Sequence, residues 1–452
     1  MTKGKPSRTT KKTSSKQGKT HRNVTPVTAS SSFFPTGSFW FITLSVFLSL
    51  MALPVLIGKF SENSDLSSAY LAPLSLWGGT ALLAFWFSRP TCFKGDRVFI
   101  ALTLLLFGLG IVEQLRLESF RFTWQVWRAY TPMLIGIGGF LFGVRFLRAE
   151  HLQKWLSWPL LRYLLWITIL ALLGALLCFG RRYRGGIFLP GQINPTELIK
   201  LLAVLLGATW LPTLKDALSR HVLGFPIPTF KALFQLAFFW GIPLAGVILV
   251  RDLGLVLILC LTFVVMLTAL TRNPFWLLLG LVGATGSGMA ICTVSAHTAA
   301  RFAIWQNPFA DPLGKGYQIL QSLCAMNAGG LTGSGLYQGM PGCVPIVSSD
   351  FVYAAIAEEW GLVGCALLLL LYTLWIRGFF QTAATTDSPQ LKLTGYGLGA
   401  VLAVQILLNI GGVTKALPMT GITLPFLSHG GFSLLTTFFL CAIAVALSKK
   451  QA

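Results

Sequence analysis

The stretch Leu253–Thr271, "LGLVLILCLTFVVMLTALT", decides the fold class of this 452-residue chain. It carries no charged side chain, and its length is close to what an α-helix needs to cross the hydrocarbon core of a bilayer. In lipid a helix satisfies its backbone N–H and C=O groups within one segment, which a lone strand cannot do. The stretch therefore predicts a membrane-spanning helix.

Comparable apolar runs recur along most of the chain. Hydrophobic residues make up 54% of the sequence, charged residues only 11%, and the mean hydropathy is +0.71. This composition is typical of a polytopic membrane protein, so soluble domain counting by length does not apply. The runs predict an all-α bundle of twelve helices, at residues 39–59, 69–87, 98–115, 129–146, 159–180, 197–213, 229–250, 253–271, 274–296, 351–376, 391–412 and 421–447.

The net charge of +21 is concentrated at the N-terminus. Eight of the 35 Lys and Arg residues lie in "MTKGKPSRTTKKTSSKQGKTHRN", which contains no acid. Such a segment is expected to be disordered, and it either tethers anionic lipid or nucleic acid or fixes topology as a cytoplasmic tail. We favour the tail, with no nucleic-acid partner. The first apolar run is too long for a cleaved signal peptide.

A cytoplasmic tail places both termini inside and predicts five segments. These are a basic tail (1–37), N-terminal transmembrane helices (38–150), core transmembrane helices (151–296), a large outer loop (297–350) and C-terminal transmembrane helices (351–448). The inner loops are basic, as the positive-inside rule requires. The outer loop "GRRYRGG" breaks the rule; it either holds an anionic substrate or is a statistical exception.

The loop 297–350 is far longer than connections in compact proteins usually are, which favours a functional role. Its run "YQILQSLCAM" is amphipathic and is expected to fold onto the mouth of the bundle. In "NPFADPLGKGYQ", Asp311 precedes a proline and either stabilises a turn or carries chemistry. The run "GGLTGSGLYQG" lacks the ending of a phosphate-binding loop.

Ionisable residues in membrane segments are costly, so they are functional candidates. Glu197 and Lys200 lie three residues apart on one helix and can pair. Asp252 either caps the following helix or serves a site. Asp350, Glu358 and Glu359 are interpreted as partners of a helix dipole at the start of the predicted helix 351–376.

The eight cysteines form no metal-binding or nucleophile motif, so we expect no metal ligand cluster and no covalent mechanism. Cys324 and Cys343 share the long loop, which leaves a disulfide between them open.

Five ordered blocks resemble the shape, elongation, division and sporulation family of cell-wall polymerases, which includes FtsW, RodA and SpoVE. They are "GRRYR…INPTELIKL", "RDLGLVLIL", "NPFADPLGKGYQILQSL…GGLTGSGL", "SSDFVYAAIAEEWGLVG" and "NIGGVTKALPMTGITLPFLSHGG", and they span about residues 180–448. The resemblance implies a ten-helix enzyme of the bacterial cytoplasmic (inner) membrane that polymerises lipid II, an undecaprenyl-diphosphate-linked disaccharide-pentapeptide, into peptidoglycan strands on the outer face.

The resemblance also implies roles for single residues. The family's essential aspartate matches Asp311 in the outer loop, here the catalytic loop. Candidate substrate contacts are Arg184, Glu197, Lys200, Asp252, Gln318, Gln321 and Ser428. No cofactor is required, although a divalent cation (Mg²⁺ or Mn²⁺) could share the diphosphate charge. Implied partners are a class B penicillin-binding protein transpeptidase, other division or elongation proteins, and membrane lipids.

The chain departs from the family pattern in several places. Five predicted helices precede "GRRYR" where three are usual, which suggests an extra N-terminal pair within 38–150 and keeps the long loop outside. Asn194, Gly185 and His429 replace more common residues, while "NIGGVT" and "GYQILQSL" favour the FtsW side.

Inverting transfer from a glycosyl diphosphate needs one general base, and a neutralised diphosphate leaves readily. The hypothesis is that Asp311 deprotonates or positions the 4-hydroxyl of the acceptor sugar. The rivals are a lipid II flippase that uses a cavity at Glu197 and Lys200, and a non-catalytic scaffold.

Overall fold

The structure is a computed structural model that describes residues 68–89, 95–117, 127–183, 186–190, 194–219, 221–222, 225–226, 228–250, 252–294 and 296–449. Within these ranges it is almost wholly helical, with two short antiparallel hairpins, β1 (Arg181–Tyr183) with β2 (Gly186–Phe188) and β3 (His221–Val222) with β4 (Phe225–Pro226). The helices are α2 (Ser68–Phe87), α3 (Arg97–Arg116), α4 (Trp127–Arg145), α5 (Ala149–Leu156), α6 (Leu161–Phe179), α7 (Pro195–Trp210), η2 (Leu211–Leu214), α8 (Lys215–Leu218), α9 (Phe230–Leu236), η3 (Ala237–Gly241), α10 (Ile242–Val250), α11 (Leu253–Thr271), α12 (Phe275–Val294), α13 (Ala296–Gln306), η4 (Pro308–Ala310), α14 (Tyr317–Gly329), η5 (Pro341–Cys343), α15 (Val352–Ala384), α16 (Pro389–Val413) and α17 (Gly431–Ser448).

The predicted all-α membrane fold is confirmed. Eight helices of the described part are long and apolar enough to cross a membrane, or nine if α4 and α5, bent by 107°, form one span. Every predicted span from residue 69 onward coincides with helix, whereas 39–59 and the tail 1–37 lie outside the described residues. The last span was expected to begin at residue 421 but begins at Gly431, because Pro418 and Pro425 interrupt helical backbone before it.

Side-chain caps explain where several helices begin. The carboxylate of Asp96 accepts the Phe99 N–H at 3.1 Å and starts α3. The side chain of Asn194 accepts the Thr196 N–H at 3.1 Å and starts α7, with Pro195 in the first turn, where its missing N–H costs nothing. These caps fix the entry points of two central helices.

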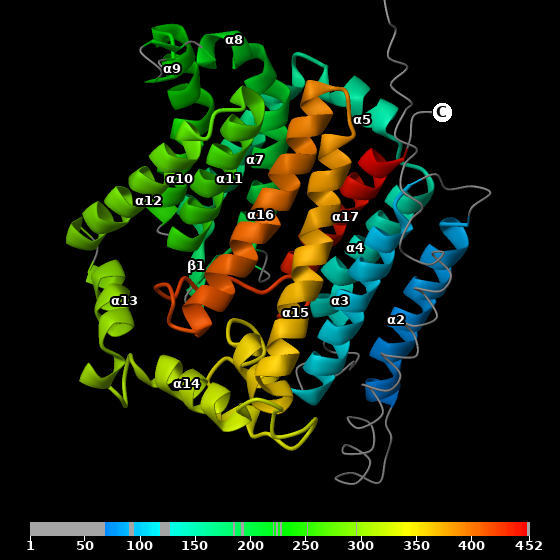
Figure 1. Cartoon of the computed structure of the whole chain (residues 1–452), viewed down its shortest axis with the longest axis vertical. Coiled ribbons are helices and arrows are strands. Elements are labelled where there is room, and N and C mark those ends of the chain that lie inside the picture. Colours follow the sequence, from blue (N-terminus) through cyan, green and yellow to red (C-terminus); the bar gives the residue numbers. More distant parts are fainter. Residues whose placement is uncertain are drawn as a thin grey trace, which may run out of the picture.

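The bundle has two ends, visible in Figure 1. The helices α13 and α14 lie at one end, and α5, α8 and α9 lie at the other. The run "YQILQSLCAM" forms α14, which packs on α15 and is tied to α16 by a hydrogen bond from Ser322 Oγ to the Val413 carbonyl at 3.1 Å. The expected docking of this run on the bundle is therefore confirmed.

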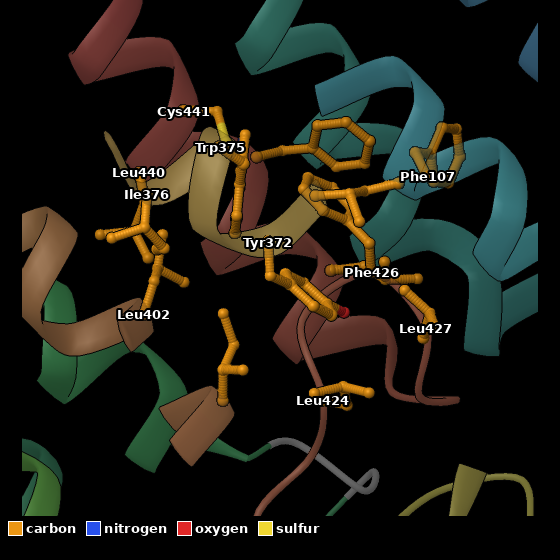
Figure 2. Packing of buried hydrophobic residues seen from close by; sticks show 14 of the residues in the cluster. Phe107, Tyr372, Trp375, Ile376, Leu402, Leu424, Phe426, Leu427, Leu440 and Cys441 are labelled. Carbon is orange, nitrogen blue, oxygen red and sulfur yellow. The ribbon is translucent and has the colours of Figure 1, made fainter. Parts of the chain in front are cut away.

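The segment 417–430, between α16 and α17, is largely irregular backbone, and its residues 424–428 are buried within the bundle. Figure 2 shows Phe426 beside Trp375, Tyr372 and Phe107; the Trp375 and Phe426 ring centroids are 5.5 Å apart, and the Tyr372 hydroxyl donates to the Pro425 carbonyl at 2.6 Å. Aromatic packing and this buried hydrogen bond hold the segment at the centre of the core.

Side-chain amides satisfy the backbone of this segment. Gln114 Nε2 donates to the Leu427 carbonyl at 2.6 Å, and Asn409 Nδ2 donates to the Ile422 carbonyl at 2.6 Å. Irregular backbone at membrane depth is tolerated only where protein or water satisfies it. The two amides, from α16 and α3, meet that requirement.

Helix α15 is broken at Gly361, whose backbone has φ 65° and ψ −168°. The glycine-rich loop 329–335 enters this break: Leu362 N–H bonds to the Gly330 carbonyl at 3.0 Å and Ser334 N–H to the Glu358 carbonyl at 2.9 Å. A Cβ atom on Gly333 would collide with the Glu359 carbonyl. The glycines of "GGLTGSGL" thus allow two backbones to approach closely.

The contact between α3 and the 417–430 segment gives a stability prediction. A Cβ atom at Gly110 would collide with the Phe426 carbonyl oxygen, so Gly110→Ala should destabilise the protein by about 1–3 kcal/mol through overpacking. Thermal unfolding of the detergent-solubilised protein measures this. The control is Gly138→Ala on α4, where a Cβ atom meets nothing within 4 Å. Equal melting temperatures for the two variants would contradict the contact.

Candidate functional site

Asp311 lies on the surface of the long loop, directly after the short helix η4. Both of its carboxylate oxygens accept backbone hydrogen bonds, Oδ1 from the Gly314 N–H and Oδ2 from the Lys315 N–H, each at 3.0 Å. Its main-chain carbonyl accepts the Gly316 N–H at 3.0 Å. The turn interpretation of Asp311 is therefore confirmed, and the turn holds the carboxylate in one orientation at the exposed surface.

The glycines after Asp311 make this turn possible. A Cβ atom on Gly314 would stand 2.5 Å from both carboxylate oxygens, and one on Gly316 would collide with the Pro308 carbonyl. An ionised carboxylate has about four lone-pair sites, and the two N–H donors use two of them. Two sites remain for a hydroxyl donor from outside the protein.

The predicted pairing on α7 is confirmed. Lys200 Nζ lies 2.7 Å from Glu197 Oε2, and the Lys200 side chain is only 4% exposed. The same ammonium donates to Gln405 Oε1 at 2.8 Å, and Gln405 Nε2 donates to the Thr423 carbonyl at 2.9 Å. A buried ion pair on α7 is thereby connected, through α16, to the 417–430 segment.

Asp252 caps α11, as one of its two interpretations predicted, with Oδ1 accepting the Leu255 N–H at 3.0 Å. Burial raises the pKa of this carboxyl, while the nearby Lys200 and Arg301 charges act in the opposite direction. Asp252 is therefore both a helix cap and part of a buried group of charges.

Arg301 and Asp350 join this group, although sequence reasoning did not select them as site residues. Burial raises the pKa of Asp350 and lowers that of Arg301, and the Arg301 charge acts on both Asp252 and Asp350. Arg301 also donates to the Thr420 carbonyl at 3.2 Å. The sequence did carry a signal for Arg301: an arginine within the apolar run "ARFAIWQ" needs buried acceptors for its charge.

A second network of polar contacts was also not predicted from the sequence. Arg116 Nε bonds to Glu359 Oε1 at 2.8 Å, and the Arg116 guanidinium lies 4.3 Å from the Tyr337 ring centroid. The other Glu359 oxygen accepts the Tyr337 N–H at 3.2 Å, and Glu358 accepts the Met340 N–H at 2.8 Å. The helix-dipole interpretation of the two glutamates is wrong, because neither lies in the first turn of α15. They hold loop backbone instead.

Three of the remaining predicted contacts lie in or against the long loop and α14. Gln318 and Gln321 are half-buried on one face of α14, three residues apart. Ser428 is buried, and its hydroxyl accepts the Leu424 N–H at 2.7 Å and donates to the Ser349 carbonyl. Arg184 lies outside the described residues. Substrate contact by these residues stays a prediction.

Two other expectations concern the loop and metals. Cys324 and Cys343 are both free thiols, so the disulfide left open by the sequence is not formed. Among the residues with described positions, no group of three His, Cys, Asp or Glu side chains is arranged to hold a metal ion.

Together these features define a multi-pass membrane protein with an anchored surface carboxylate above a buried charge network. A family model described as "Cell cycle protein", that of FtsW, RodA and SpoVE, matches residues 97–452. The chain belongs to this family. The match begins at the first residue of α3, so α2 and the predicted helix 39–59 precede the matched region.

Named relatives agree with this assignment. The chain is 35% identical over 402 residues to "Peptidoglycan glycosyltransferase RodA" of Mycobacterium tuberculosis, covering 85% of this chain and 83% of that one. It is 30% identical over 371 residues to "Stage V sporulation protein E" of Bacillus subtilis, covering 79% and 97%. The preference for the FtsW branch stays a prediction, since relatives with all three kinds of name match.

Solved structures share the fold. One is described as "Structural coordination of polymerization and crosslinking by a peptidoglycan synthase complex", with a TM-score of 0.61, 26% identity and coverage of 78% of this chain and 96% of that one. Rod shape determining protein RodA of Thermus thermophilus matches with a TM-score of 0.55 at 24% identity, covering 80% and 100%. The second likeness speaks for the fold alone.

The ion pair on α7 gives a prediction about its contribution to stability. Lys200→Met leaves the Glu197 carboxylate and the Gln405 amide oxygen without their buried donor, so the free energy of unfolding should fall by about 3–5 kcal/mol. The double variant Glu197→Gln with Lys200→Met should recover part of that loss. Thermal unfolding of Lys200→Met, Glu197→Gln and the double variant completes the cycle, and purely additive effects would contradict a coupled pair.

Proposed function

We propose that this protein is a peptidoglycan glycosyltransferase that polymerises lipid II into glycan strands at the outer face of the bacterial cytoplasmic membrane. The family match over residues 97–452 and the relatives that carry this enzyme name support the activity. The basic inner loops support the orientation, with both termini in the cytoplasm and the long loop outside. The observation that carries the proposal is the anchored carboxylate of Asp311 on that loop.

Asp311 is proposed as the general base. In the reaction, the 4-hydroxyl oxygen of the acceptor sugar attacks the anomeric carbon of the donor, the bond from that carbon to the diphosphate breaks, and the hydroxyl proton passes to Asp311. Direct displacement inverts the anomeric configuration. The two backbone N–H donors orient the carboxylate before substrate binds, which removes an ordering cost from the reacting state.

The diphosphate leaving group needs positive charge nearby. Arg184 is the proposed contact from the outer hairpin loop, because a guanidinium can bind two phosphate oxygens at once. The Lys200 ammonium is already paired with Glu197, so its proposed role, shared with Glu197 and Asp252, is to hold the buried group of charges in place. Among the described residues no group of three His, Cys, Asp or Glu side chains is placed to hold a cation beside the diphosphate.

We further propose that the enzyme works with a class B penicillin-binding protein transpeptidase, in division or elongation. The structural relative whose description pairs polymerization with crosslinking supports a crosslinking partner of this kind. Gln318, Gln321 and Ser428 are proposed to contact or frame the substrate, since the two glutamines lie on α14 of the long loop and the Ser428 hydroxyl donates to the Ser349 carbonyl of that loop.

Removing the base should abolish polymerisation. Asp311→Asn keeps the size of the side chain but cannot accept the acceptor proton, so glycan formation should fall about 10²–10⁴-fold. Purified protein, with and without the transpeptidase, is incubated with lipid II and the strands are separated by length on a gel. A well-folded Asp311→Asn variant with full activity would exclude the general-base role.

Displacing the carboxylate should have a similar but smaller effect. Gly314→Ala puts a methyl group against both Asp311 oxygens, so activity should fall at least about tenfold while the melting temperature changes little. The matched control is Gly342→Ala in the same loop, where a Cβ atom meets nothing within 4 Å. A non-catalytic scaffold or a flippase would make no glycan with any of these proteins, which distinguishes failure of the whole proposal from failure of the Asp311 assignment.

A further inference from the structure

A cavity of about 420 Å³ lies at the end of the bundle opposite α14. It opens between two parts of the chain that are far apart in sequence, the junction of α11 with α12 and the junction of α15 with α16. Its main lining residues are Val265, Arg272, Leu277, Phe380, Lys392 and Tyr396.

Two cations face this cavity. Arg272 follows the last residue of α11 in the left-handed conformation, with φ 55°, and its backbone N–H bonds to the Thr268 carbonyl at 2.8 Å. The Arg272 residue is exposed. Lys392 is half-buried near the start of α16. Neither side chain forms an ion pair in the described part of the chain, and no acidic residue lines the cavity. The pair is therefore available to an external anion.

Apart from Thr268, the rest of the lining is aliphatic or aromatic, and exposed leucines continue from it along α12. Leu277 is 46% exposed, and Leu281, one turn further along α12, is 60% exposed. On the other wall the Phe380 and Tyr396 rings lie 5.9 Å apart, and tyrosine is enriched where a membrane meets water. The cavity therefore combines a charged end with an apolar track of the kind an acyl chain follows.

We propose that this cavity binds an anionic phospholipid, with its phosphate between Arg272 and Lys392 and one acyl chain along α12. Basic pockets between transmembrane helices are suited to acidic headgroups, and arginine can hold two phosphate oxygens while lysine adds a point charge. A bound lipid would connect the α11–α12 turn with the α15–α16 turn. The site lies at the opposite end from Asp311 and does not depend on the proposed function.

The test uses full-length protein that has been washed free of lipid in detergent. Its melting temperature is followed while dioleoyl phosphatidylglycerol, dioleoyl phosphatidylcholine or inorganic phosphate is added. The concentration of phosphatidylglycerol that gives half of the maximal rise in melting temperature should be at least about tenfold lower than that of phosphatidylcholine, which has the same acyl chains. Inorganic phosphate alone should do nothing at the same concentration, because it lacks the apolar part.

Variants locate the effect. Arg272→Gln with Lys392→Gln should weaken phosphatidylglycerol binding roughly 25-fold, about fivefold for each cation. The control is Lys154→Gln with Lys231→Gln, which removes the same charge from exposed positions on α5 and α9 at the same end. If the first double variant fails to fold, Arg272→Lys with Lys392→Arg should fold and keep phosphatidylglycerol binding within about threefold.

Three results would overturn the proposal. The first is equal potency of the two lipids, and the second is an equal loss of phosphatidylglycerol binding in the two double variants that remove charge. The third is stabilisation by inorganic phosphate that matches the stabilisation by phosphatidylglycerol. The last result would indicate a simple anion site.

Discussion

Backbone polar groups that leave helical geometry within a membrane must find partners inside the protein, and the architecture follows from that constraint. The 417–430 segment leaves helical geometry apart from one turn, which the hydrogen bond from the Ser428 N–H to the Leu424 carbonyl closes at 3.0 Å. Gln114 and Asn409 supply amide donors to its carbonyls, while Ser428 accepts one of its N–H groups. The loop 329–335 solves the same problem differently, by bonding its backbone to the break in α15 at Gly361.

These two irregular segments place the charged residues. The 417–430 segment brings its Thr420 carbonyl to Arg301 and its Thr423 carbonyl to Gln405, which in turn accepts from Lys200. Elements from four parts of the chain therefore meet in this network. Among the residues whose positions are described, Arg272 and Lys392 at the other end form no ion pair and line a cavity with mostly apolar neighbours. The two ends are suited to different ligands, a sugar diphosphate and a membrane lipid.

The sequence predicts the helices well because a span of about 20 apolar residues has few alternatives in lipid. It also predicts local contacts, such as the Glu197 and Lys200 pair and the Asp252 cap, since both depend on spacing within one helix. It does not reveal the partners of Arg116 or Arg301, because their acceptors lie more than 100 residues away and no periodicity connects them. The predicted start of α17 was ten residues too early, because hydropathy counts the apolar run "ITLPFL" as part of the span, whereas Pro418 and Pro425 interrupt helical backbone there.

The network of α3 also bears on the order in which the protein is made. Gln114 and Arg116 are polar side chains near the C-terminal end of α3, and their acceptors in the folded chain are residues 339, 348, 359 and 427. Those acceptors follow their donors by more than 200 residues in the chain and are therefore synthesised later. During that interval α3 must keep its polar end in water at the membrane surface or in the insertion machinery. Final burial of α3 is therefore among the last steps of assembly, although α3 is among the first helices made.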